Sequence, residues 1–201
     1  MELQDSLKKG VELGRVWLLL LVLVFGGCSV KHTRVGLTDT RTLVMKVPDA
    51  QIEYKILRLE TAIRSLSAEV DEAEAKAFSR AAILYPRYLA QRYELVSPPN
   101  LHNFLITVGL KERGLCYHWA GDLMAYLKKQ KFNSFDLYRA VARQGRINEH
   151  SSIVVTARGR PFAEGIVLDA WRNSSDLYFE KVTLDKEYRW EPNRKYRVER
   201  G

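Results

Sequence analysis

The chain has 201 residues, of which 46% are hydrophobic and 28% are charged, and its formal net charge is +8. That length suits one domain with appendages, and the composition excludes collagen, a wholly disordered chain and a disulfide-stapled miniprotein. Only one uninterrupted apolar run occurs, near the amino terminus, which excludes a polytopic membrane protein.

That apolar run covers residues 16–25. It is too short for a membrane-spanning helix, which needs about 20 apolar residues, and it fits the core of an export signal. Gly26 and Gly27 follow the run directly and precede Cys28. This order resembles a bacterial lipoprotein signal, which implies a signal peptide over 1–27 and a lipid on Cys28. Because Ser rather than Asp follows the cysteine, the resemblance implies the outer membrane of the cell envelope, facing the periplasm. An uncleaved amino-terminal anchor is the alternative.

The only other cysteine is Cys116. Exported chains in an oxidising compartment normally pair their cysteines. If Cys28 carries lipid, Cys116 has no partner in the chain. A lone thiol of this kind is either buried and inert or retained for its chemistry.

Residues 28–48 are predicted to be a tether, with a short strand over 42–47. From residue 49 the apolar residues recur at alternating spacings of four and three, which predicts a helical region over 49–97. A cap near Asp71 predicts a second helix, and Pro86 is expected to kink or restart it. We expect this region to pack on its own domain; a coiled coil with a helical partner is the alternative. The stripe consists of Ile52, Ile56, Leu59, Ile63, Leu66 and Val70.

Residues 98–201 are predicted to form the catalytic core. A helix is expected from Cys116 to Lys129, after which the hydrophobic period changes to two. Helices followed by antiparallel strands predict an α+β fold, with amino-terminal helices and then a helix packed on an antiparallel sheet. The expected strands are 135–142, 152–157, 165–170 and 178–184.

Three residues of this core form a candidate catalytic site. Cys116 begins a predicted helix, where unpaired amides and the helix dipole favour a thiolate. His150 begins one apolar strand and Asp169 ends the next, so antiparallel pairing brings them to the same edge of the sheet. A cysteine, a histidine and a carboxylate together are the groups of an activated thiol nucleophile, its base and the residue that orients the base.

The segments 114–120, 149–150 and 168–171 resemble the transglutaminase-like cysteine proteinases of bacteria, which have a papain-like fold. The resemblance covers roughly residues 100–172. It implies that Cys116 is the nucleophile, His150 the base and Asp169 the orienting residue. The resemblance does not carry over a substrate; we expect a protein or peptide.

An oxyanion could be held by the backbone amides of Cys116 and Tyr117, and Asn103 is a candidate for a further hydrogen bond. His118 is expected to be structural, because two residues along a helix it points to another side from Cys116. The pair Cys116 and His118 lacks a second ligand pair at zinc spacing, so no metal is expected, and no cofactor is implied.

Three functions are compatible with these residues. The first is a thiol hydrolase of peptide or isopeptide bonds that acts through an acyl-enzyme. The second is an acyl or glutamyl transferase of the same fold, and the third is a catalytically silent lipoprotein that binds a partner through its helices. No nucleic-acid recognition motif accompanies the positive charge, which favours anionic lipid headgroups or cell-wall polymers as partners.

Overall fold

The computed structural model describes residues 35–38, 42–193, 195 and 199–200. The expected signal peptide over 1–27 and the lipidation site Cys28 lie outside these residues. None of the described helices combines the length and the apolar character that crossing a membrane would require.

The segment predicted to be a tether is, in its described part, a packed hairpin. Strands β1 (Val35–Leu37) and β2 (Leu43–Met45) pair antiparallel, and both contact helix α3. Val35 is 2% and Leu43 4% exposed. The prediction of a tether over 28–48 is therefore wrong for this part, because two apolar side chains hold it against the helices.

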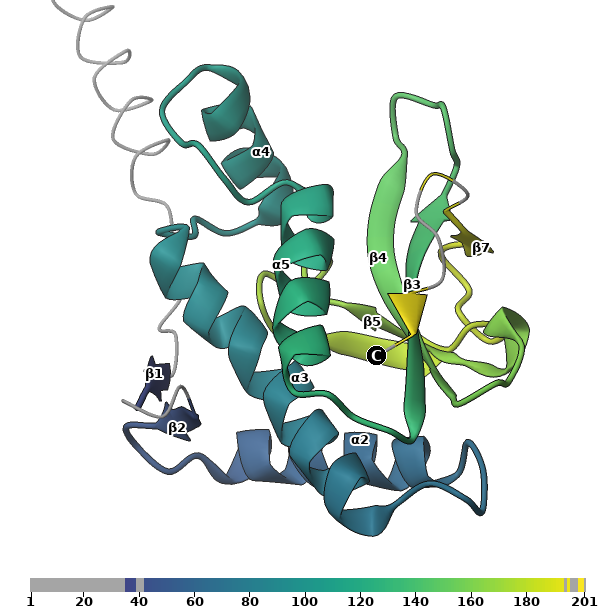
Figure 1. Ribbon diagram of the computed structural model, residues 1–201. Helices are drawn as coiled ribbons and strands as arrows, with labels where there is room; N and C mark the ends of the chain where they lie inside the picture. The colour runs from purple at the N-terminus through teal and green to yellow at the C-terminus, as the bar shows by residue number, and fades with distance from the viewer. Residues whose placement is uncertain (1–34, 39–41, 194, 196–198, 201) are drawn as a thin grey trace, which may run out of the picture.

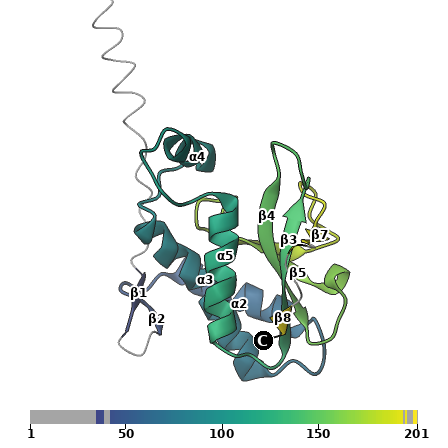
Figure 2. The same cartoon turned by 45° about the horizontal axis from the view of Figure 1, so that its top comes forward.

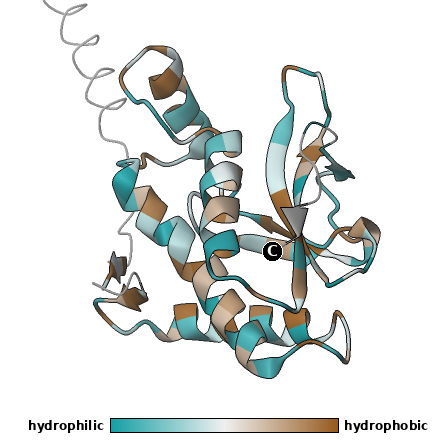
Figure 3. Ribbon diagram, viewed as in Figure 1, coloured by the Kyte–Doolittle hydropathy of each residue, from teal (hydrophilic) through white to brown (hydrophobic). Residues whose placement is uncertain are grey.

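Two capped helices make up the predicted helical region. Helix α2 spans Ala50–Arg64, and the Asp49 carboxylate accepts hydrogen bonds from the backbone N–H groups of its first turn. Helix α3 spans Glu72–Arg92, and Asp71 caps it by accepting from the N–H of Glu74 at 2.8 Å. Hydrophobic and hydrophilic residues alternate along both helices (Figure 3). Each carboxylate satisfies amides that the helix leaves unpaired, which is why the helices begin where they do.

Pro86 does not interrupt α3, so the restart of the helix that was the alternative to a kink does not occur. The helix runs unbroken through Pro86, whose side chain is buried. A proline leaves carbonyl groups of the preceding turn without their usual partners. The carbonyl that loses its donor is that of Ala82, four residues before Pro86, and the guanidinium of Arg87 donates to the neighbouring carbonyl of Ile83 at 3.0 Å.

Helix α4 (Pro99–Thr107) was not among the elements predicted from the sequence. Its residues are largely apolar but show no clear helical periodicity, which is why the sequence did not indicate a helix. Its first residue is a proline, which suits the first turn of a helix. A loop then leads to α5, which spans Cys116–Lys129 with the predicted bounds. Figure 1 and the turned view in Figure 2 show α4 on one side of the amino end of α5 and, on the other, the hairpin of β3 (Phe135–Ala142) and β4 (His150–Ala157).

The second half of the chain forms an antiparallel sheet with the strand order β6-β5-β4-β3-β7, and β8 also pairs with β3. Strand β3 has the predicted bounds, and β4 begins two residues earlier than predicted, at His150. The α+β prediction, helices first and antiparallel strands after, is confirmed. The strands are β3 (Phe135–Ala142), β4 (His150–Ala157), β5 (Ile166–Asp169), β6 (Tyr178–Lys181), β7 (Glu191–Pro192) and β8 (Glu199–Arg200), with the short 3₁₀ helix η1 (Phe162–Glu164) before β5.

The main core lies between the helices and one face of the sheet. The stripe predicted on α2 is buried there, with Ile52 and Ile56 4% exposed and Leu59 and Ile63 fully buried. On α3, Phe78 is fully buried and contacts the ring of Phe135 on β3 at 4.9 Å. The helical region therefore packs on the sheet domain, and its apolar stripe is used within the chain. A smaller cluster on the opposite face of the sheet includes Tyr188 and Trp190.

Candidate active site

Cys116 is the first residue of α5 and is partly exposed. It is the only cysteine among the described residues, and it forms no disulfide. The backbone N–H groups of Cys116 and Tyr117 have no hydrogen-bond acceptor among the described residues; the first intrahelical bonds begin with the N–H groups of His118 and Trp119. Two unpaired amides therefore accompany the sulfur at the positive end of the helix dipole.

His118 holds the loop that presents Cys116. Its Nδ1 accepts hydrogen bonds from the backbone N–H groups of Gly114 at 3.2 Å and Leu115 at 3.3 Å. These bonds require the neutral ring, and burial, followed by the charge of Arg113, lowers the pKa of His118. The side chain that sequence reasoning expected to be structural therefore caps the loop.

A second histidine fixes the other side of this loop. His102 on α4 is fully buried, and its Nδ1 accepts from the N–H of Val96 at 3.2 Å. Its Nε2 therefore carries the proton and donates to the carbonyl of Arg113 at 2.9 Å. The indole of Trp119 donates to the carbonyl of Gly114 at 2.7 Å. The backbone just before Cys116 is thus held by side chains from two helices.

We expect Gly114→Ala to displace this loop. Gly114 has φ +132°, which alanine adopts only with strain, and an added Cβ would lie 2.3 Å from Nε2 of His102. The free energy of unfolding should fall by about 2 kcal/mol or more, and alkylation of Cys116 should slow. Denaturant unfolding and iodoacetamide labelling measure the two effects.

Gly159→Ala is the matched control, because Gly159 also has a positive φ, +72°, but has open space around its Cβ position. It should cost about 1 kcal/mol of backbone strain and leave the labelling rate unchanged. Equal effects of the two substitutions would contradict the assigned role of the contact between His102 and Gly114.

The strand register brings His150 and Asp169 together. Strands β4 and β5 pair Ile153 with Leu168, so continuing the register places Ser152 opposite Asp169. His150 lies two residues before Ser152, on the same face of its strand, and is a diagonal neighbour of Asp169. The two side chains are 4% and 1% exposed, and Nε2 of His150 lies 2.7 Å from Oδ2 of Asp169.

His150 also interacts with Cys116. Burial alone would lower the pKa of His150, but the hydrogen bonds to Asp169 and to Cys116, with the charges of both groups, outweigh burial and raise the pKa to about 9. Because Nε2 faces Asp169, Nδ1 is the ring nitrogen left to exchange a proton with the sulfur. The structure thus brings the three predicted residues into one connected group.

Arg172, which sequence reasoning missed, binds the same oxygen of the Asp169 carboxylate as His150. Its Nε donates to Oδ2 at 3.1 Å, while Oδ1 accepts from the backbone N–H groups of Trp171 and Arg172. Burial would raise the pKa of Asp169, but the hydrogen bond from His150 and the charges of His150 and Arg172 keep it below its ordinary value. Asp169 therefore stays ionised and fixed in orientation.

Arg172 is in turn fixed by carboxylates and rings. Its two terminal nitrogens donate to both oxygens of Asp185, at 3.2 and 2.7 Å, and its guanidinium lies 3.9 Å from the ring centroid of Tyr178. Burial would lower the pKa of Arg172, but Asp185 and Asp169 raise it. Asp185 also accepts from the indole of Trp190 at 2.8 Å. Residues that follow Asp169 in the chain thus fix the position of its carboxylate.

We expect Arg172→Gln to destabilise the protein by about 3 kcal/mol, because it leaves the carboxylates of Asp169 and Asp185 buried without their shared cation. Urea unfolding monitored by tryptophan fluorescence measures this loss. Arg189→Gln removes the same charge from an exposed position nearby and should change stability by about 0.5 kcal/mol or less. An equal effect of both substitutions would rule out the bridging role.

Aromatic rings enclose the imidazole of His150. The ring centroids of Tyr188, Trp171 and Trp190 lie 4.7, 5.0 and 5.4 Å from it. Trp171 also donates its indole N–H to Oδ1 of Asn103 at 3.2 Å. These rings shield the hydrogen bond between His150 and Asp169 from water, which strengthens it.

The two predicted oxyanion residues differ in position. Tyr117 follows the nucleophile directly and offers its backbone amide, while its side chain is 51% exposed. Asn103 lies within α4 rather than in a turn, and its amide oxygen faces Trp171. Asn103 is thereby linked through Trp171 to the aromatic rings around His150. Its NH₂ group remains the donor that the oxyanion hypothesis requires.

Sequence reasoning found the three central residues and missed their supports: His102, Arg172, Asp185, Tyr188 and Trp190. The aromatic residues that recur after Asp169 were the available signal. Within the part of the chain that the structure describes, no group of three or more His, Cys, Asp or Glu side chains could hold a metal ion.

Comparison with known proteins gives no match: no family model, no curated protein and no solved structure is similar to this chain.

Proposed function

We propose that this protein is a thiol hydrolase of the bacterial cell envelope, a cysteine peptidase or amidase with a transglutaminase-like, papain-like fold. One observation carries the proposal: Cys116, at the start of α5, interacts with a buried His150 that is bonded to Asp169 at 2.7 Å. This is the order of groups that activates a thiol for attack on an acyl carbon.

The proposed reaction uses the groups in sequence. Nδ1 of His150 takes the thiol proton and holds it as an imidazolium, and the thiolate of Cys116 attacks the carbonyl carbon of an amide or ester. The amides of Cys116 and Tyr117 stabilise the negative oxygen of the tetrahedral intermediate. The imidazolium then gives its proton to the leaving amine, and a thioester remains on Cys116. Water, deprotonated by His150, releases the acid and restores the thiol.

Trapping the thioester tests this proposal. The protein is mixed with a set of peptide esters, quenched in acid within seconds, and its intact mass is measured. We expect an acyl adduct on Cys116 that is absent in Cys116→Ser. Adducts that never form, together with a thiol that reacts with iodoacetamide no faster than free cysteine, would overturn the proposal and favour the silent, partner-binding lipoprotein.

The same experiment separates hydrolysis from acyl transfer. Glycine amide added at increasing concentration competes with water for the thioester. We expect the free acid to remain the main product, as for a hydrolase. If the amine-linked product dominates at low amine concentration, the acyl or glutamyl transferase of the same fold is the correct function.

The proposed location is the outer membrane, with the lipid on Cys28 and the body of the protein facing the periplasm. Residues 16–28 carry this proposal, through their order of apolar run, glycines and cysteine. Labelling of expressing cells with radioactive palmitate tests it. We expect label in the full chain and none in Cys28→Ala; label retained in that variant would exclude lipidation at this residue.

A further inference from the structure

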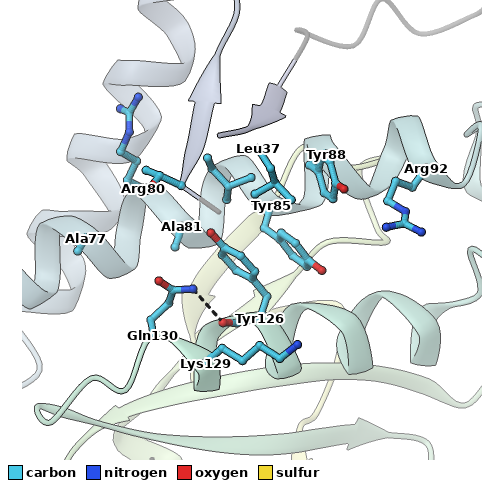
Figure 4. A pocket seen from close by; sticks show the side chains of 12 residues that line it. Leu37, Ala77, Arg80, Ala81, Tyr85, Tyr88, Arg92, Tyr126, Lys129 and Gln130 are labelled. Atoms are coloured by element: carbon cyan, nitrogen blue, oxygen red, sulfur yellow. Dashed lines mark hydrogen bonds between the residues drawn. The ribbon is translucent and has the colours of Figure 1, made fainter. Parts of the chain in front are cut away.

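A pocket of about 770 Å³ lies between α3, α5 and the β1–β2 hairpin, in the part of the domain nearest the carboxyl end of α5 (Figure 4). Its size falls within the range of small-molecule sites, about 300–1,000 Å³. Segments far apart in the sequence form its walls, so it exists only because the hairpin packs on α3 rather than extending as a tether. None of the residues of the candidate catalytic group lines it.

Tyrosines form the main wall of the pocket. The rings of Tyr85 on α3 and Tyr126 on α5 are stacked, with centroids 4.0 Å apart and planes 8° apart, and the ring of Tyr88 lies 5.8 Å from that of Tyr85. Burial raises the pKa of Tyr85 to about 12 and also raises the pKa of Tyr126. Their hydroxyls therefore remain neutral hydrogen-bonding groups at any physiological pH.

The charged residues that line the pocket are all cations: Arg80, Arg92 and Lys129. Arg80 pairs with Glu53 at 3.0 Å, whereas Arg92 interacts with the hydroxyl of Tyr88. No acidic residue is among the described lining residues. In Figure 4 the ammonium of Lys129, the guanidinium of Arg92 and the hydroxyl of Tyr85 lie toward the same end of the pocket. That end therefore suits an anionic group.

We propose that this pocket binds a segment of an acidic glycan. Tyr85 and Tyr126 are stacked on each other, so only their edges and outer faces, with the ring of Tyr88, would contact the C–H groups of sugar rings. The hydroxyls of the three tyrosines suit the many hydroxyls of a sugar. Arg92 and Lys129 bind its carboxylate or phosphate substituent. A small inorganic anion would use only the cationic end and leave the tyrosine wall unoccupied.

The inference does not depend on the proposed thiol chemistry. Cys116 and Lys129 lie at opposite ends of α5, which at 1.5 Å per residue separates them by about 20 Å. The pocket can therefore bind its ligand whether or not Cys116 reacts, and the two proposals fail separately.

Calorimetric titration of the full chain with three probes tests whether the pocket binds an acidic glycan. The probes are trigalacturonate, its fully methyl-esterified form, which has the same size without charge, and inorganic phosphate. We expect saturable binding of trigalacturonate, binding of the neutral ester weaker by about tenfold or more, and no saturable binding of phosphate.

The double variant Arg92→Gln with Lys129→Gln should weaken trigalacturonate binding by about tenfold or more, because both exposed cations lose their charge without disturbing the core. Lys181→Gln with Arg189→Gln removes two exposed charges from the other side of the domain and should leave binding unchanged. Tyr126→Phe should weaken the acidic and the neutral probe alike, since it removes a hydroxyl and keeps the ring stack.

Three outcomes would overturn the proposal. They are the absence of saturable glycan binding, binding of phosphate as strong as that of trigalacturonate, and equal losses in the two double variants, which would indicate general attraction to a basic protein. Alkylation of Cys116 by iodoacetamide is measured in every variant and should remain at the wild-type rate.

Discussion

His150→Gln should slow the alkylation of Cys116 at pH 7 by about tenfold or more and reduce peptide hydrolysis by roughly 10³-fold to 10⁶-fold. The reason is geometric: His150 is the only titratable group that connects the sulfur to Asp169 among the described residues. Glutamine keeps a polar side chain at the position but cannot take up a proton. Iodoacetamide labelling followed by intact mass measurement gives the first rate, and the thioester assay gives the second.

His32→Gln is the matched control, because it exchanges the same residue types outside the described residues. It should leave both rates unchanged. If alkylation in His150→Gln proceeds at the wild-type rate while the protein remains folded, the imidazole does not activate the thiol and the proposed mechanism is wrong.

Asp169→Asn should lower the pKa of His150 well below its present value of about 9, because it removes the negative charge and the hydrogen bond that oppose the effect of burial. In the wild type, the imidazolium form persists until the pH rises through about 9, and the leaving amine then loses its proton donor. In the variant this loss should begin at lower pH, and hydrolysis at pH 7 should fall by about 10²-fold to 10⁴-fold.

The ring ¹⁵N shifts of His150, followed by NMR against pH, measure this change without any substrate. The raised pKa also contributes to stability: the contribution is complete below about pH 6.5 and is lost as the pH rises through about 9. Asp136→Asn is the control, since Asp136 is a buried β3 carboxylate that accepts from the N–H of Gly159, away from His150. An unchanged titration in Asp169→Asn would contradict the assigned coupling.

Hydrophobic periodicity predicted the elements that carry the site. The bounds of α5 and β3 agree with prediction because each has a complete pattern of its own period and a clear break at both ends. The juxtaposition of His150 and Asp169 followed from antiparallel pairing of neighbouring strands alone. Elements next to each other in the chain therefore carried enough information to place the central residues.

The supports of the site depend on contacts that no local pattern encodes. Asp185 follows β6 and binds Arg172, which precedes that strand, and His102 reaches Gly114 from a helix whose composition gave no period. The possible restart at Pro86 was wrong because the proline side chain is buried within a continuous helix, which is a property of the packed structure. Side-chain networks of this kind become visible only once the backbone is placed.

The packing of the β1–β2 hairpin on α3 sets how far the protein could reach from a membrane. In the proposed lipoprotein, only residues 29–34 separate the acylated Cys28 from the first residue of the hairpin. Seven peptide steps span at most about 25 Å. The domain that carries Cys116 would then stay within roughly one molecular diameter of the bilayer surface. Substrate bonds that lie farther from the membrane would be out of its reach.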